Sequence, residues 1–177
     1  MSDGTPMKIR IWHASRDAYH CAFRMIRLLS AAPGLSIELE RLRILDMYLL
    51  FPPLLHRTSM TQELKAQFRA LEIPDEDKIF ERLPSMASVY QELRVYQNAA
   101  ANYLAAKDVL GREALKKGVA EFRYSNLPSK VSTDVSARNS EQSAFLQFLV
   151  NDFAKIPLTG SDSIYRRAGL PARHLVS

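Results

Sequence analysis

Histidine and cysteine are the residues of this chain best suited to catalysis or metal binding. The four histidines stand apart, and none has the four-residue or HExxH spacing that places two ligands on one helix face: His13, His20, His56 and His174. His20 and Cys21 are neighbours, but adjacent residues of a helix point about 100° apart and do not face each other. The sequence therefore predicts no catalytic residue and no metal site, and Cys21 is expected to be a small core residue.

The patterns that hold a nucleotide or a calcium ion are missing as well. Neither GxxxxGK[ST] nor GxGxxG occurs, and only six glycines are present. Acidic residues gather at positions 72–81, but their spacing is not that of an EF-hand loop. We interpret this cluster as a solvated turn or an electrostatic contact to a partner. No cofactor is predicted, and the protein is expected not to be an enzyme.

Basic residues surround a candidate strand at residues 119–124, the region where a winged-helix domain would carry its wing. They are Arg112, Lys116, Lys117, Arg123 and Lys130. Two interpretations stay open. The side chains could contact the phosphates of DNA, a contact that releases counterions and is independent of base sequence. They could equally be ordinary solubilising charges.

A second candidate surface lies near the end of the chain, where Tyr165, Arg166 and Arg167 combine an aromatic ring with positive charge. Terminal segments fray unless they bind something, and residues 157–177 contain many apolar side chains. We therefore predict one compact helical domain over residues 1–177, with residues 157–177 as a docking segment for a partner.

Composition sets the class of protein. The chain has 177 residues, 47% of them apolar, and one cysteine, which excludes an internal disulfide framework and fits a reducing compartment. The first residues do not resemble a secretory signal, and the longest apolar run is broken by Pro52 and Pro53, far short of the ~20 residues that span a bilayer. A soluble, cytoplasmic protein without membrane contact is expected. The net charge of +5 permits an acidic or nucleic-acid partner without requiring one.

Helical periodicity dominates the chain. Asp17 is predicted to cap a helix over residues 17–31, with an apolar face around Met25 and a polar stripe that contains Arg24 and Arg27. Ser36 is predicted to cap a helix over residues 37–51 whose second half is buried. A rod from Ser85 to Gly111 forms the centre, and its alanines at positions 99–101 allow another helix to approach closely.

The remaining elements are shorter. We expect a strand at residues 8–13, helices after a Ser59 cap and around Phe80, an exposed loop over residues 130–139, a helix from Asn139 or Ser140 to residue 156, and a short helix within 161–168. The predicted fold class is mainly α with a small β element, for which a winged-helix arrangement is one form.

Two stretches of the sequence resemble the small middle component of ABC-three-component conflict systems. The first runs from Asp17 to Phe51 and includes YHCAFRMIRLL and IELERLRILDMYLLFP, and the second runs from Leu158 to Pro171. The resemblance implies a subunit encoded beside an SMC- or Rad50-like ATPase and an effector, with a nuclease as one candidate. Lamassu-type anti-phage defence has this organisation, in which the ATPase senses foreign DNA. These are packing motifs, so no functional residue carries over.

Three hypotheses follow. The first is a non-enzymatic accessory subunit that binds the ATPase through apolar helix faces and reaches DNA through the complex. The second is a free-standing winged-helix DNA-binding regulator. The third, with the least support, is a small enzyme that uses His20, His56 or the acidic cluster.

Overall fold

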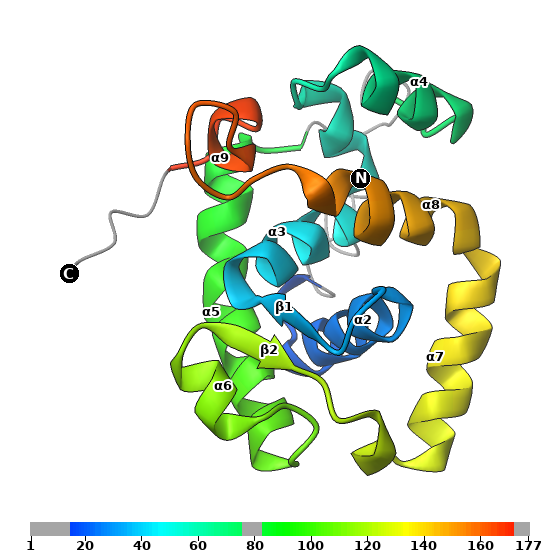
Figure 1. Ribbon diagram of the computed structural model, residues 1–177, viewed down its shortest axis with the longest axis vertical. Coiled ribbons are helices and arrows are strands. Elements are labelled where there is room, and N and C mark those ends of the chain that lie inside the picture. Colours follow the sequence, from blue (N-terminus) through cyan, green and yellow to red (C-terminus); the bar gives the residue numbers. More distant parts are fainter. Residues whose placement is uncertain (1–14, 76–82, 172–177) are drawn as a thin grey trace, which may run out of the picture.

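Three helices from different parts of the chain pack against one another at the centre of the structure (Figure 1). They are α2 (Ala18–Ala31), α3 (Leu39–Leu50) and α5 (Met86–Ala106). The computed structural model describes residues 15–75 and 83–171. The strand predicted at residues 8–13 and the helix predicted around Phe80 lie outside the described residues.

Side-chain caps start the two longest helices of the core where the sequence predicts them. The Asp17 carboxylate accepts hydrogen bonds from the backbone N–H groups of Tyr19 and His20, and Ser85 Oγ accepts one from Ser88. The predicted helix over residues 17–31 is therefore confirmed. The rod ends at Ala106, before Gly111, because Asp108 adopts a positive φ of 59° and turns the chain.

The predicted Ser36 cap is wrong. Residues Ser36–Glu38 form strand β1, which pairs antiparallel with β2 (Val119–Glu121), and Ile37 stands opposite Ala120. This pairing keeps the backbone extended, so α3 begins only at Leu39. Its second half is buried as predicted, and Pro52 ends it by starting the 3₁₀ helix η1 (Pro52–Arg57).

The sheet element does not have the hairpin of a wing. Strand β2 is flanked on its other side by a bridge between Leu110 and Phe122, and the short helix α6 (Arg112–Lys116) lies between these two segments. The candidate strand at residues 119–124 ends early: Ala120 and Phe122 are buried, whereas Tyr124 is exposed in η3 (Tyr124–Asn126). A mainly α fold with a small β element is confirmed.

Residues 130–139 are not the exposed loop that the sequence predicts. This polar stretch is helix α7 (Ser129–Glu141) and not a loop. Val135 is its one buried residue, so most of the helix faces solvent and carries almost no apolar periodicity to detect. The final long helix starts later than predicted, as α8 (Ser143–Gln147), and continues through the π-helical turn η4 (Phe148–Asp152) and the 3₁₀ turn η5 (Phe153–Lys155).

Two further helices lie at the end of the molecule opposite the sheet (Figure 1). Helix α4 (Gln62–Ala70) is capped by Thr61, whose hydroxyl accepts from Leu64 N, and not by Ser59 as predicted. Ser59 N instead donates to the carbonyl of Arg167. Helix α9 (Ile164–Arg167) lies within the predicted short helix at 161–168.

Replacement of Phe153 tests the packing between the centre and the C-terminal third. Its ring is 1% exposed and lies edge-on to Tyr48 at 5.0 Å between centroids. We expect Phe153→Ala to lower the free energy of unfolding by about 3–5 kcal/mol, because it leaves a cavity. Leu35→Ala, at a side chain that is 69% exposed, should change it by less than about 0.5 kcal/mol. Urea denaturation followed by circular dichroism measures both, and equal stabilities would contradict this packing.

Candidate functional site

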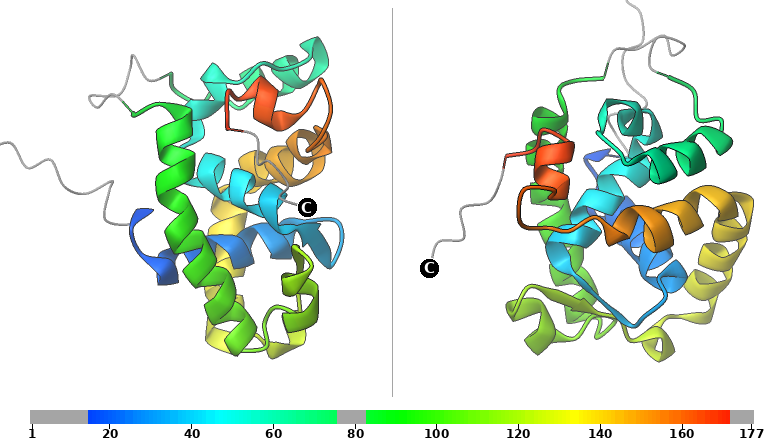
Figure 2. Two further views of the ribbon diagram at one scale, coloured as in Figure 1. Left: turned by 90° about the vertical axis from the view of Figure 1, so that its left-hand side faces the viewer. Right: turned by 45° about the horizontal axis from the view of Figure 1, so that its top comes forward.

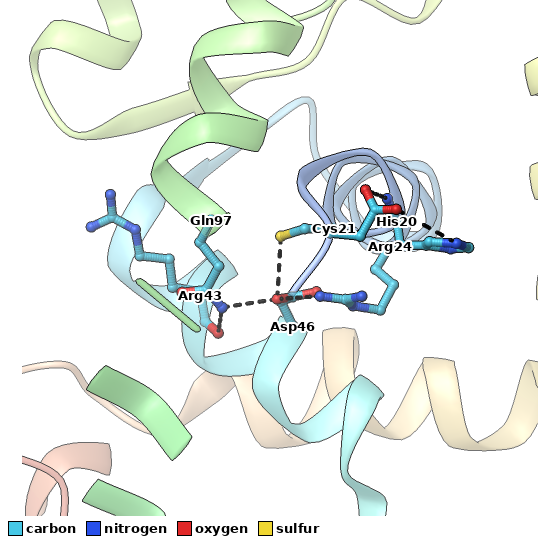
Figure 3. Close-up of polar contacts among 7 residues, drawn as sticks. His20, Cys21, Arg24, Arg43, Asp46 and Gln97 are labelled. Carbon is cyan, nitrogen blue, oxygen red and sulfur yellow. Dashed lines mark hydrogen bonds and ion pairs between the residues drawn. The ribbon is translucent and has the colours of Figure 1, made fainter. Parts of the chain in front are cut away.

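A buried charged cluster joins the three central helices (Figure 3). The Asp46 carboxylate on α3 is fully buried and pairs with Arg24 of α2, with Nε to Oδ1 at 2.6 Å and Nη2 to Oδ2 at 3.2 Å. Gln97 of α5 donates from Nε2 to the same Oδ2 at 2.8 Å and to the carbonyl of Arg43 at 3.0 Å. Polar side chains from all three central helices therefore meet at the Asp46 carboxylate.

The polar stripe predicted on α2 is not a solvent-facing stripe. Arg24 and Arg27 are 8% and 5% exposed. Arg24 faces α3, while Arg27 donates to Asn139 Oδ1 at 3.0 Å and Gln142 Oε1 at 2.7 Å, which ties α7 to α2. Burial lowers the pKa of Arg27. The side-chain oxygens of Asn139 and Gln142 accept the hydrogen bonds of its guanidinium group. The sequence carried a signal for this cluster, because Asp46 is a lone carboxylate inside an otherwise apolar run of α3.

Cys21 belongs to the same cluster. Its Sγ lies 3.6 Å from Asp46 Oδ2, and burial, with the nearby carboxylate, raises the pKa of the thiol far above its ordinary value. His20 lies on the exposed side of α2, where its ring is 4.0 Å from Asp17. Figure 3 shows the side chains of His20 and Cys21 pointing apart. A buried thiol that stays protonated is a poor nucleophile.

A second polar junction holds the C-terminal third to the centre. Glu40 Oε2 accepts hydrogen bonds from Tyr90 of α5 at 2.8 Å and from Tyr165 of α9 at 3.2 Å, and Oε1 accepts from Arg43. Burial, together with these acidic and phenolic neighbours, raises the pKa of Tyr90. Tyr90 thus remains a neutral donor.

These contacts determine where the predicted docking residues lie. Tyr165 is 7% exposed and packs inside the chain. Arg166 is exposed, and Arg167 donates to Asp162 and accepts a backbone hydrogen bond from Ser59. The described part of the docking segment, residues 157–171, is therefore anchored to the chain's own centre, and its contact with a partner stays a prediction.

The five predicted nucleic-acid contacts lie on one end of the molecule, around α6, β2 and the start of α7 (Figure 1). Arg112 donates to the carbonyls of Ala105 and Ala106. The acidic partners of the others are Glu113 for Lys116, Asp108 and Glu121 for Arg123, and Asp134 for Lys130. Lys117 is exposed. Acidic neighbours therefore offset much of the positive charge at this end, which weakens attraction to phosphates.

The other histidine and acidic side chains of the described residues do not come together in one site. A hollow of about 450 Å³ beside α4 contains His56, whose Nε2 is 2.8 Å from the carbonyl of Ile73, together with Lys65 and Arg69. Within residues 15–75 and 83–171, no three His, Cys, Asp or Glu side chains are placed to hold a metal ion. In the same part of the chain, no helix has both the length and the apolar character needed to cross a membrane. His13 and His174 lie outside the described residues.

Comparison with known proteins gives one result. The family model for the ABC-three component (ABC-3C) system Middle Component 5 matches residues 10–174. The chain belongs to this family. Searches of curated proteins and of solved structures give no match. The suspected resemblance to a middle component is thereby confirmed at the level of the ABC-three component system.

In the part of the middle component that the structure describes, the exposed large apolar side chains lie in two places. One is the sheet surface, which we define as Leu35 and Tyr124 with the basic residues Arg123 and Lys130; Leu35 and Tyr124 are 69% and 53% exposed. They lie on either side of Phe122, which donates its N–H to Leu35 and packs edge-on against Tyr124. The other is the outer face of α5.

Removal of one member of the buried ion pair tests the cluster. We expect Asp46→Ala to cost about 3–5 kcal/mol of unfolding free energy, because it leaves the Arg24 guanidinium buried without its counter-charge. The double variant Arg24→Met, Asp46→Leu should be more stable than Asp46→Ala alone. Urea denaturation of the three proteins measures the difference, and a double variant less stable than Asp46→Ala would contradict this account.

Cysteine labelling tests the burial of Cys21. The chain has one cysteine, so a maleimide reagent should label the native protein very slowly and the urea-unfolded protein at once. An Ala137→Cys variant, changed on the exposed side of α7, should accept one label rapidly without denaturant. Rapid labelling of the native wild type would refute this burial.

Because the folded-state pKa of Cys21 is raised, the free energy of unfolding should fall as pH rises through the ordinary thiol pKa of 9.0.

Proposed function

We propose that this middle component is a non-enzymatic accessory subunit that joins an SMC- or Rad50-like ATPase to an effector, with a nuclease as one candidate. In this proposal it acts in an anti-phage or anti-plasmid defence system of the Lamassu type. The ATPase senses DNA, and the middle component helps control the effector. DNA is reached through the assembled complex.

The match of residues 10–174 to a middle component carries this proposal, because a component implies partner subunits. The buried clusters support a structural role. Asp46, Cys21 and Tyr90 are engaged by neighbouring helices and have no open access to a substrate. Their polar groups hold α2, α3, α5 and α9 in place.

The sheet surface is our candidate for the ATPase contact. Tyrosine and arginine are enriched in protein interfaces, and here Tyr124 and Arg123 accompany the exposed Leu35 to give an apolar centre with a charged rim. Arg123 and Lys130 already pair with acidic residues of this chain, so they contribute to the rim and not to a strong DNA site.

Co-purification with the ATPase encoded beside this chain tests the proposal. We expect the tagged ATPase to retain the wild-type middle component and to lose the Leu35→Asp, Tyr124→Ala variant, because these changes remove the apolar centre of the sheet surface. Ser140→Asp, a matched change on the exposed side of α7, should be retained. A wild-type chain that elutes alone beside its ATPase would overturn the proposal.

DNA binding by the isolated chain separates this function from that of a free-standing regulator. We expect weak binding at about 50 mM salt and none at physiological salt, because acidic partners offset the basic residues around α6. Fluorescence anisotropy with a labelled duplex measures it. Tight, strongly salt-dependent binding that is abolished by Lys116→Glu, Lys117→Glu would favour the regulator instead.

A further inference from the structure

The outer face of α5 is the longest uncovered helical surface of the described chain. In the left-hand view of Figure 2, α5 runs along the molecule and no other described helix crosses in front of it. Residues 95–106 carry no charge, although Val95, Ala99, Asn102 and Ala106 are all exposed. Val95 is 69% exposed, directly opposite the buried side of the helix.

Two tyrosines extend this face along one flank. Tyr103 of α5 is 38% exposed, and Tyr19 of α2 is 67% exposed. Their rings lie edge-on at 5.2 Å between centroids, and Lys107 lies 5.9 Å from the centre of the Tyr103 ring. Among residues 15–75 and 83–171, three of the five exposed large apolar side chains therefore lie on this face: Tyr19, Val95 and Tyr103.

The alanines at positions 99–101 divide between two surfaces. Ala100 and Ala101 are buried, and α5 packs closely against α2 on that side. Ala99 faces the other way and is exposed. Exposed residues 95, 99, 102 and 106 follow the alternation of four- and three-residue steps that forms a helix-pairing seam. A small residue at the centre of such a seam allows a second helix to approach to about 8 Å.

The sequence of this face is self-complementary about Ala99. In an antiparallel pair of α5 helices that cross at Ala99, Val95 of one copy lies opposite Tyr103 of the other, because the two residues are equally spaced from Ala99. Glu92 and Arg94 precede the uncharged segment, and Lys107 and Asp108 follow it; Asp108 is paired with Arg123 of the same chain. Glu92 lies seven residues before Ala99 and Lys107 eight residues after it, so the same crossing brings Glu92 of each copy to within about one residue of the level of Lys107 of the other, on the flank that holds Tyr103.

We propose that the middle component self-associates through this face into a two-fold symmetric dimer, with α5 antiparallel to its copy. The charge pattern fits a second copy, since in the antiparallel arrangement Glu92 and Lys107 of one chain face Lys107 and Glu92 of the other, whereas a parallel pair would bring like charges together. Two buried valines and the four tyrosines form the apolar centre. The complex then holds two middle components, a statement independent of which surface binds the ATPase.

The mass of the full chain in solution tests the dimer. Light scattering during size-exclusion chromatography should give twice the chain mass for the wild type and the single-chain mass for Ala99→Arg, because the two-fold axis places the introduced charges against each other. The matched change Ala137→Arg on α7 should leave the dimer intact. Circular dichroism should show equal helix content in all three proteins.

A charge exchange tests the direction of the pairing. Glu92→Lys should weaken the dimer about tenfold in sedimentation equilibrium, and Lys107→Glu should do the same, since like charges replace two ion pairs. The combined exchange should restore the wild-type dissociation constant. A monomeric wild type, a dimeric Ala99→Arg, or a combined variant as weak as the single ones would overturn this proposal. A monomer that still co-purifies with the ATPase would overturn it and leave the proposed function intact.

Discussion

The charged pair between Arg24 and Asp46 determines how the centre of this protein is organised. A carboxylate with no exposed surface can exist only where its charge and its lone pairs are satisfied. Arg24, Gln97 and Cys21 meet that need from two helices, and this fixes the relative positions of α2, α3 and α5. An apolar core alone would tolerate several ways of sliding these helices past one another. Here a shift by one turn would leave a buried charge unpaired.

The sequence allows prediction of the helices that face this core and fails where the signal comes from distant partners. Asp17 and Ser85 cap helices in a purely local way, so their positions were predictable. Strand β1 depends on pairing with β2, and nothing in its own three residues indicates that pairing. Helix α7 depends on hydrogen bonds from Arg27, which belongs to a helix far away in the chain. Polar periodicity alone could not show that this arginine is buried.

The candidate functional residues show the same difference between local signals and contacts with distant parts of the chain. The basic residues around α6 were found by composition, but composition does not reveal that Asp108 and Asp134 offset their charge. Tyr165 was found as an aromatic residue near basic ones, and the structure places it in the interior on Glu40. The apolar surface at Leu35 was missed, because an isolated leucine between glycine and serine has no pattern around it. The family match over residues 10–174 identifies the chain as a middle component, which none of these local patterns could do.

The junction at Glu40 has a consequence for the biogenesis of the protein. One carboxylate collects donors from α5 and from α9, so the interior is completed only when residue 165 has left the ribosome. Until then Glu40 and Tyr90 lack their contacts with Tyr165. A product truncated before α9 would therefore keep this side of the junction open.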